Sequence, residues 1–158
     1  MGEPASTDPA GRRAGVLPAA CHDRRVPIMP QLSVTVRARG AAPPAEVWDR
    51  YVRPERWASW SPQIRSVQVP AAVLTPGLRG TVHGPAGLRV SFVVEDVDAG
   101  AGQWSWRVHA GPVSLRLAHR VWARPTGTAT SLLLHGPAPV VLGYLPVARL
   151  ALHRLVQP

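Results

Sequence analysis

The sequence predicts an α+β domain in which an antiparallel sheet curves around a long C-terminal helix. Two observations carry this prediction: segments with the period-two alternation of half-buried strands fill the middle of the chain, and a long apolar helical pattern follows them. The length of 158 residues has room for one domain of ordinary size. A curved sheet that closes against a single helix tends to leave an apolar cavity between the two, so we expect such a cavity here.

The N-terminal segment differs in composition from the rest of the chain. Residues 1–28 contain Pro, Gly, Ala, Ser and charged residues without periodicity, so we expect a disordered tail there and a folded domain over 29–158. Met29 stands immediately before the first regular segment, and our hypothesis is that it is the true start. The apolar stretch before Cys21 has only seven residues and contains Pro18, which does not suit a secretory signal. A cytoplasmic protein is the simpler interpretation.

A strand and two short helical segments open the folded part. Apolar and polar residues alternate over 31–37, which predicts a half-buried strand. The segment 42–52 begins with two prolines, which suit a helix start because the first amides of a helix lack helical partners anyway. A second helical turn opens at Pro54 and ends at 60–62.

The middle of the chain consists of strands and turns. Pro-Gly pairs and Gly-rich sequences separate its apolar segments, as expected for a series of hairpins. The predicted strands cover residues 64–69, 79–84, 88–97, 103–109, 113–124 and 128–135. With the first strand they form a sheet of about seven strands.

The last segment, 140–157, has a helical pattern. Its polar residues Arg149, His153 and Gln157 recur every four positions and form one narrow stripe, whereas its other faces are apolar. We therefore expect this helix to be largely enclosed by protein. No apolar run in the sequence reaches the ~18 residues that a membrane span needs.

Two motifs near the start of the folded part resemble a known superfamily. The sequence Ala42-Pro43-Pro44-Ala45-Glu46-Val47-Trp48, followed by Pro54-Glu55-Arg56-Trp57-Ala58-Ser59-Trp60-Ser61-Pro62, resembles the opening of the START-like superfamily, often labelled SRPBCC or polyketide cyclase/dehydrase. The similarity covers about residues 31–156. It implies a helix-grip fold, in which a seven-stranded antiparallel sheet grips the C-terminal helix around an apolar cavity. Members include ligand carriers, cyclases, hormone receptors and a ribosome-associating toxin branch, so the fold does not decide the function.

The charge of the chain comes from arginine alone. Eighteen basic residues face nine acidic ones, a formal net charge of +9, and the chain contains no Lys. Arg without Lys, beside abundant Ala, Gly and Pro, is typical of a GC-rich bacterial coding sequence. Seven of the arginines occupy strand positions opposite the apolar ones: Arg37, Arg39, Arg89, Arg107, Arg116, Arg120 and Arg124. Such a face could attract RNA, anionic membranes or an acidic partner, but it has few aromatic residues apart from Trp122 for base stacking. A solvated outer face is the simpler interpretation.

His119 is the one candidate for acid–base chemistry. It shares a strand face with Leu115, Leu117 and Val121, so we expect it to point inward. A partly desolvated histidine with a pKa near neutrality could shuttle a proton or polarise a carbonyl group. The alternative is a core histidine that is hydrogen-bonded to the backbone.

A wider set of residues is expected to line a ligand cavity. Apolar walls would supply affinity, and His119, Thr130 and Tyr144 would orient the ligand. Packing in the core is the alternative for each aromatic member. The candidate ligand-binding residues are Trp60, Phe92, Trp106, His119, Thr130, Leu134 and Tyr144.

Other kinds of site find no support in the sequence. A single cysteine, Cys21, excludes an internal disulfide and a cysteine-based zinc site, and the six histidines are scattered. No Gly-rich phosphate loop opens a helix, and no nucleophile motif of the Gly-x-Ser-x-Gly type occurs. We expect neither a metal nor a cofactor.

Three functions remain open on this sequence. The first is binding of a small hydrophobic molecule, lipid-, polyketide- or isoprenoid-like, between the sheet and the last helix. The second, which the resemblance suggests, is cyclase or aromatase chemistry on a polyketide-like chain with His119 as acid or base. The third is an RNA- or ribosome-associated module that uses the arginine face. Both a monomer and a homodimer are compatible with the sequence.

Overall fold

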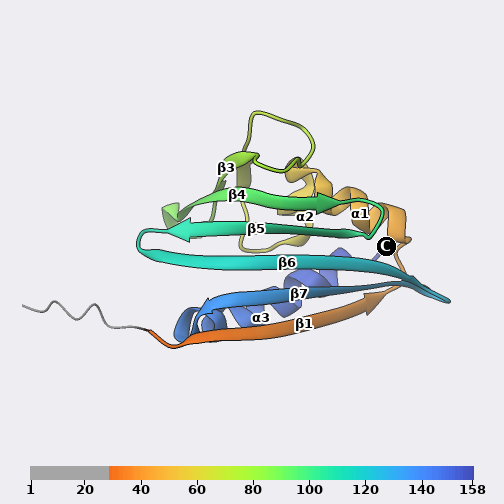
Figure 1. The fold of residues 1–158 in the computed structure, drawn as a ribbon. Helices are drawn as coiled ribbons and strands as arrows, with labels where there is room; N and C mark the ends of the chain where they lie inside the picture. Colours follow the sequence, from red (N-terminus) through yellow and green to blue (C-terminus); the bar gives the residue numbers. More distant parts are fainter. Residues whose placement is uncertain (1–28) are drawn as a thin grey trace, which may run out of the picture.

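A computed structural model describes residues 29–158, so the expected tail over 1–28 and the question of the true start lie outside the described residues. Figure 1 looks onto one sheet with the helices behind it. The strands are β1 (Gln31–Gly40), β2 (Ser66–Gln68), β3 (Arg79–His83), β4 (Arg89–Asp98), β5 (Gln103–Ala110), β6 (Val113–Arg124) and β7 (Gly127–Pro137). The helices are α1 (Pro44–Val52), α2 (Trp57–Trp60) and α3 (Ala138–Leu155), with 3-10 turns η1 (Pro54–Arg56) and η2 (Pro85–Gly87).

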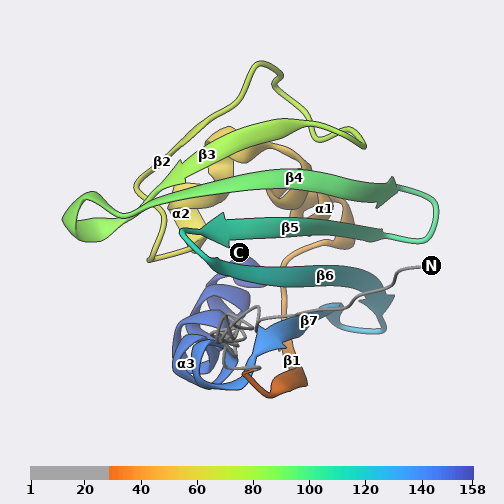
Figure 2. The same cartoon turned by 60° about the vertical axis from the view of Figure 1, so that its left-hand side comes forward.

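The sheet is antiparallel, with the strand order β1-β7-β6-β5-β4-β3-β2. Strands β3 to β7 follow one another as hairpins, whereas β1 pairs with the last strand, so that Val36 lies opposite Leu132. Helix α3 packs against β1 and β7, and α1 packs against β6 and β7. Figure 2 shows α3 beside the β1–β7 edge and α2 near the middle of the sheet. The space between these helices and β4, β5 and β6 holds the candidate site.

This architecture confirms the predicted α+β helix-grip fold with seven strands. The predicted strand over 64–69 is shorter in the structure, because the Ile64 amide donates to Ser61 O in a turn and pairing begins only at Ser66. The predicted C-terminal helix begins slightly earlier, at Ala138. Its start follows the expected rule, since prolines at 137 and 139 occupy positions where a helix needs no amide donor.

Helix α3 is less enclosed than its apolar sequence predicts. Leu142 and Leu150 are 55% and 44% exposed, because the sheet and α2 cover the helix from one side only. Pro146 lies inside the helix, where it cannot donate a hydrogen bond to the carbonyl of Leu142. Within residues 29–158, no helix is both long enough and apolar enough to span a bilayer.

The C-terminal end of α3 is tied to the first part of the domain. Arg50 Nη1 on α1 donates to Leu155 O at 2.7 Å, a carbonyl in the last turn of the helix, and to Gln157 O at 2.6 Å just beyond it. Gly40 at the end of β1 lies so close to the helix end that a Cβ atom there would stand 2.1 Å from Val156 O. These contacts fix the helix, and hence the far wall of the interior space, against the sheet.

Candidate functional site

The interior between the sheet and α3 contains two neighbouring cavities. The outer cavity has a volume of about 280 Å³ and is lined mainly by aliphatic side chains, six of them valines: Val82, Val90, Val108, Val113, Val140 and Val147. The inner cavity has a volume of about 30 Å³ and lies among aromatic side chains. Five residues line both: Gln63, Ile64, Trp106, Leu117 and Tyr144.

The position of the outer cavity follows from the inward-facing residues of β5. Trp104 and Trp106 point into the interior at one end of this strand, and Val108 and Ala110 occupy the equivalent positions towards the other end. Side-chain volume therefore falls along the strand while the backbone geometry stays the same. The tryptophans fill the inner end, whereas the small side chains leave the outer end open.

An aromatic cluster closes the inner end. The Trp57 ring of α2 lies 5.7 Å from the rings of Phe92 and Trp104 and 5.0 Å from the ring of Trp106. Its Nε1 donates to Tyr51 O at 2.8 Å, so the one polar atom of this buried side chain is paired. The cluster is a packed core in which contacts between rings position Trp106 and His119.

His119 faces this cluster as predicted, and its surroundings keep it neutral. The imidazole is 5% exposed and stacks on Trp104, with a centroid distance of 4.4 Å and an interplanar angle of 5°. Trp106 Nε1 donates to His119 Nε2 at 3.2 Å, so the ring carries its own proton on Nδ1. Burial lowers the pKa of His119 to about 3, because the charged form would lose its solvation. The pKa near neutrality that acid–base chemistry needs is therefore absent.

Gln63 and Tyr144 form the polar part of the wall that the two cavities share. Gln63 Nε2 donates to Tyr144 Oη at 2.7 Å, which joins the segment after α2 to helix α3. Burial raises the pKa of Tyr144 to about 12, so its hydroxyl stays protonated. Among residues 29–158, the other polar side-chain atom in the outer lining is Nε1 of Trp106, which His119 engages.

Four of the seven candidate ligand-binding residues meet at the cavities. Trp60 and His119 line the inner one, and Trp106 and Tyr144 line both. The other three candidates, Phe92, Thr130 and Leu134, are buried but line neither cavity. Phe92 packs on Trp57 and Trp106, and Leu134 is a fully buried core residue.

Thr130 takes part in a hydrogen-bonded chain that the sequence did not indicate. Its Oγ1 donates to Arg120 O at 2.9 Å and lies 2.6 Å from Tyr51 Oη, so its hydroxyl is fully engaged within the protein. Burial raises the pKa of Tyr51 above its ordinary value. The pair holds α1 to β7 and leaves no group free for a ligand.

Sequence reasoning missed Gln63 and the valines of the outer cavity. Gln63 belongs to an irregular segment, and its role is visible only once Tyr144 lies opposite it. The valines give the alternating pattern of any half-buried strand. Only their position beyond the tryptophans of β5 could have indicated an empty space.

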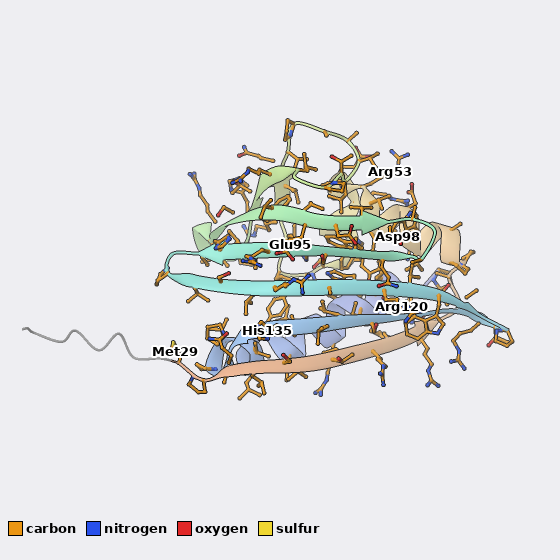
Figure 3. All side chains as sticks on the ribbon, viewed as in Figure 1. Met29, Arg53, Glu95, Asp98, Arg120 and His135 are labelled. Carbon is orange, nitrogen blue, oxygen red and sulfur yellow. The ribbon has the colours of Figure 1, made fainter. Side chains whose placement is uncertain are left out.

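The seven arginines lie on the other face of the sheet, as predicted, and Figure 3 looks onto this face. Glu95, at an irregularity in β4, accepts hydrogen bonds from Arg107 at 2.7 Å and Arg116 at 2.5 Å. These guanidinium groups, Arg116 first, lower the pKa of Glu95. Arg120 lies 6.0 Å from the centre of the Trp122 ring. The positive charge is therefore concentrated towards β1 and β6 and partly neutralised near β4.

Metal binding has no support in the described part of the chain. No group of three or more His, Cys, Asp or Glu side chains in residues 29–158 could hold an ion. No charged side chain lines either cavity.

Solved structures share this architecture at low sequence identity. The crystal structure of Ara h 8.0201 matches with a TM-score of 0.65 and 12% identity over 80% of this chain and 95% of that one. The crystal structure of protein CV1439 from Chromobacterium violaceum matches with a TM-score of 0.59 and 16% identity, over 80% of this chain and 98% of that one. At these identities the likeness shows the fold alone.

Sequence comparison assigns the family. A search of curated protein sequences found no significant match. The model of the family described as polyketide cyclase/dehydrase and lipid transport matches residues 31–157, which include every helix and strand of the structure. The chain therefore belongs to the polyketide cyclase/dehydrase and lipid transport family, within the START-like (SRPBCC) superfamily.

Proposed function

We propose that this protein binds a small hydrophobic molecule in the outer cavity. The observation that carries the proposal is a largely aliphatic space of about 280 Å³, whose lining includes the polar side chains of Gln63 and Tyr144 and an indole N–H of Trp106 that His119 already engages. An engineered apolar cavity of about 150 Å³ is large enough to admit benzene. A space roughly twice that size suits a molecule of one or two rings or a short branched chain. Small polyketide- or isoprenoid-like compounds fit this description better than a full-length lipid.

The cavity favours binding over acid–base catalysis. A general acid must be protonated at the working pH. Because the pKa of His119 is lowered to about 3, its imidazolium form, which could donate a proton, is not populated near neutral pH. Its Nε2 is engaged by Trp106, and the side chain lies at the inner cavity rather than in the larger outer one. The cyclase alternative therefore lacks a proton donor in this histidine. Family membership and fold are consistent with hydrophobic ligand binding.

A pair of neighbouring substitutions on β5 tests the proposal. Val108 lines the outer cavity, and the next residue, His109, is exposed. We expect Val108→Trp to fill the cavity and to weaken binding of the apolar fluorescent probe N-phenyl-1-naphthylamine by at least about ten-fold. His109→Trp adds the same ring outside the cavity and should bind the probe like the wild type.

The measurement is fluorescence titration of the probe, with circular dichroism to verify that both variants are folded. Native mass spectrometry of the freshly purified protein would report any co-purified molecule. Failure of the wild type to bind the probe would contradict the proposal, as would equal binding by a folded Val108→Trp variant.

A further inference from the structure

Three residues that line the inner cavity each carry a polar atom for which the fold supplies no partner. His119 Nδ1, Trp104 Nε1 and Gln63 Oε1 are buried and lack a hydrogen-bond partner among the described residues. All three side chains line the inner cavity. Buried polar groups in folded proteins are nearly always paired. Three such atoms on residues that line one small space therefore indicate a site for a polar group from outside the chain.

The donor and acceptor character of these atoms defines that group. Nδ1 of His119 carries a hydrogen, because Nε2 accepts the hydrogen bond from Trp106. Trp104 Nε1 is also a donor, and it can never accept. Gln63 Oε1 is an acceptor, since the amide nitrogen of this residue donates to Tyr144. The complement of two donors and one acceptor is an oxygen that accepts twice and donates once, which is a hydroxyl group.

Charge and size narrow the choice further. Among residues 29–158, no charged side chain lines either cavity, so an ionised carboxylate or ammonium would lose its solvation without gaining a counter-ion there. A cavity needs about 10–15 Å³ to hold one water molecule, so 30 Å³ accommodates one hydroxyl group but no ring. The five residues common to both linings place the two cavities against each other.

We propose that the inner cavity binds the terminal hydroxyl of an uncharged alcohol or phenol whose hydrophobic body occupies the outer cavity. This inference rests on the proposed function and adds the chemical class of the ligand. In this arrangement the free N–H groups of His119 and Trp104 donate to the ligand oxygen, and Gln63 accepts its hydrogen. Ketones and hydrocarbons of the same shape lack that hydrogen, and the hydrocarbons also lack the acceptor.

Two ligands of nearly equal shape test the inference: 2-naphthol and 2-methylnaphthalene. Their dissociation constants would be measured by displacement of N-phenyl-1-naphthylamine from the wild type, Trp104→Phe and His119→Leu. For each protein we take the ratio of the two dissociation constants and compare this ratio between the wild type and the variants. The two ligands differ in their solvation in water, but this difference is the same for every protein and therefore cancels in the comparison. We expect the preference for 2-naphthol to fall about five-fold or more in each variant, the effect of one hydrogen bond. Leu133→Val changes an exposed neighbour on β7 that lines neither cavity, and it should keep the preference.

A spectroscopic measurement on the unmodified protein covers the case in which a variant fails to fold. In 15N-labelled wild type, 2-naphthol should shift the Trp104 Nε1–H and His119 Nδ1 resonances, whereas 2-methylnaphthalene should leave them nearly unchanged. Equal effects of the two ligands would overturn the inference. The ionised analogue 2-naphthoate should bind at least about ten-fold more weakly than 2-naphthol.

The outcomes separate this inference from the proposed function. If both neutral ligands bind the wild type with a ratio that Trp104→Phe and His119→Leu leave unchanged, the hydroxyl site is wrong and the hydrophobic cavity stands. Binding of 2-naphthoate as tight as that of 2-naphthol would also overturn the hydroxyl site. If neither ligand nor probe binds the wild type, the proposed function fails and the hydroxyl site with it.

Discussion

The two ends of the interior share strands β5 and β6 but are occupied differently. At the inner end, Trp57, Trp104 and Trp106 pack ring against ring around a space of about 30 Å³. At the outer end, Val108 and Ala110 continue β5 and leave about 280 Å³. The volume of the inward-facing side chains along one strand therefore decides where the interior of this fold stays open.

The largest expected effect is on stability, and it should distinguish the two ends. Trp57→Ala removes a fully buried ring from the aromatic cluster and should lower the free energy of unfolding by about 3–5 kcal/mol. Val108→Ala removes two methyl groups that already border an open cavity, and it should cost about 1 kcal/mol or less. Urea unfolding followed by circular dichroism measures both. Similar losses at the two positions would show that the outer end is packed as tightly as the inner one.

The pH dependence of stability tests how well the inner end excludes water. The pKa of His119 is lowered to about 3 in the folded protein, against about 6.5 in an unfolded chain. The unfolded state therefore binds the proton first, so stability is fully present above pH 6.5 and is lost as the pH falls towards 3. The expected slope is about 1.4 kcal/mol per pH unit, or about 2 kcal/mol between pH 6.5 and 5.

The His119→Gln variant supplies the reference for this pH effect. The slope of its unfolding free energy against pH should be smaller than that of the wild type. The difference between the two slopes is the contribution of His119. Parallel pH profiles of the two proteins would mean that the imidazole takes up a proton as readily in the folded state as in the unfolded one. Such a result would place water at the inner end.

The smallest expected effect concerns the wall between the two ends. Tyr144→Phe removes the acceptor of the Gln63 amide and should destabilise the protein by about 1 kcal/mol. The ring remains, so binding of the apolar probe in the outer cavity should change little. A probe affinity reduced more than about ten-fold would show that the hydroxyl, and not the aliphatic wall, governs binding at the outer end.

The sequence predicted the elements of this fold well because local patterns encode them. Alternation along β6 identified His119 as inward-facing, and the prolines before α1 marked the start of that helix. These features depend on neighbours in the chain. They could be read without knowing how the strands pair.

The cavities could not be predicted in the same way, because they depend on side chains from distant segments. The outer cavity requires Val108 of β5 to lie opposite Leu115 of β6 and beneath Val147 of α3. The hydrogen bond between Gln63 and Tyr144 joins residues 81 positions apart. The low pKa of His119 is likewise a result of burial by Trp104 and Tyr51, which no local pattern specifies.

The pairing of β1 with β7 also has a consequence for biosynthesis. Strands β3 to β6 can assemble from local hairpins as they leave the ribosome, but β1 must wait for the strand that is made last. Closing so large a loop is slow, because the chain loses conformational entropy before the stabilising contacts between β1 and β7 form. Until then β6 presents an unpaired edge. We therefore expect the nascent chain to expose this edge until β7 has been synthesised.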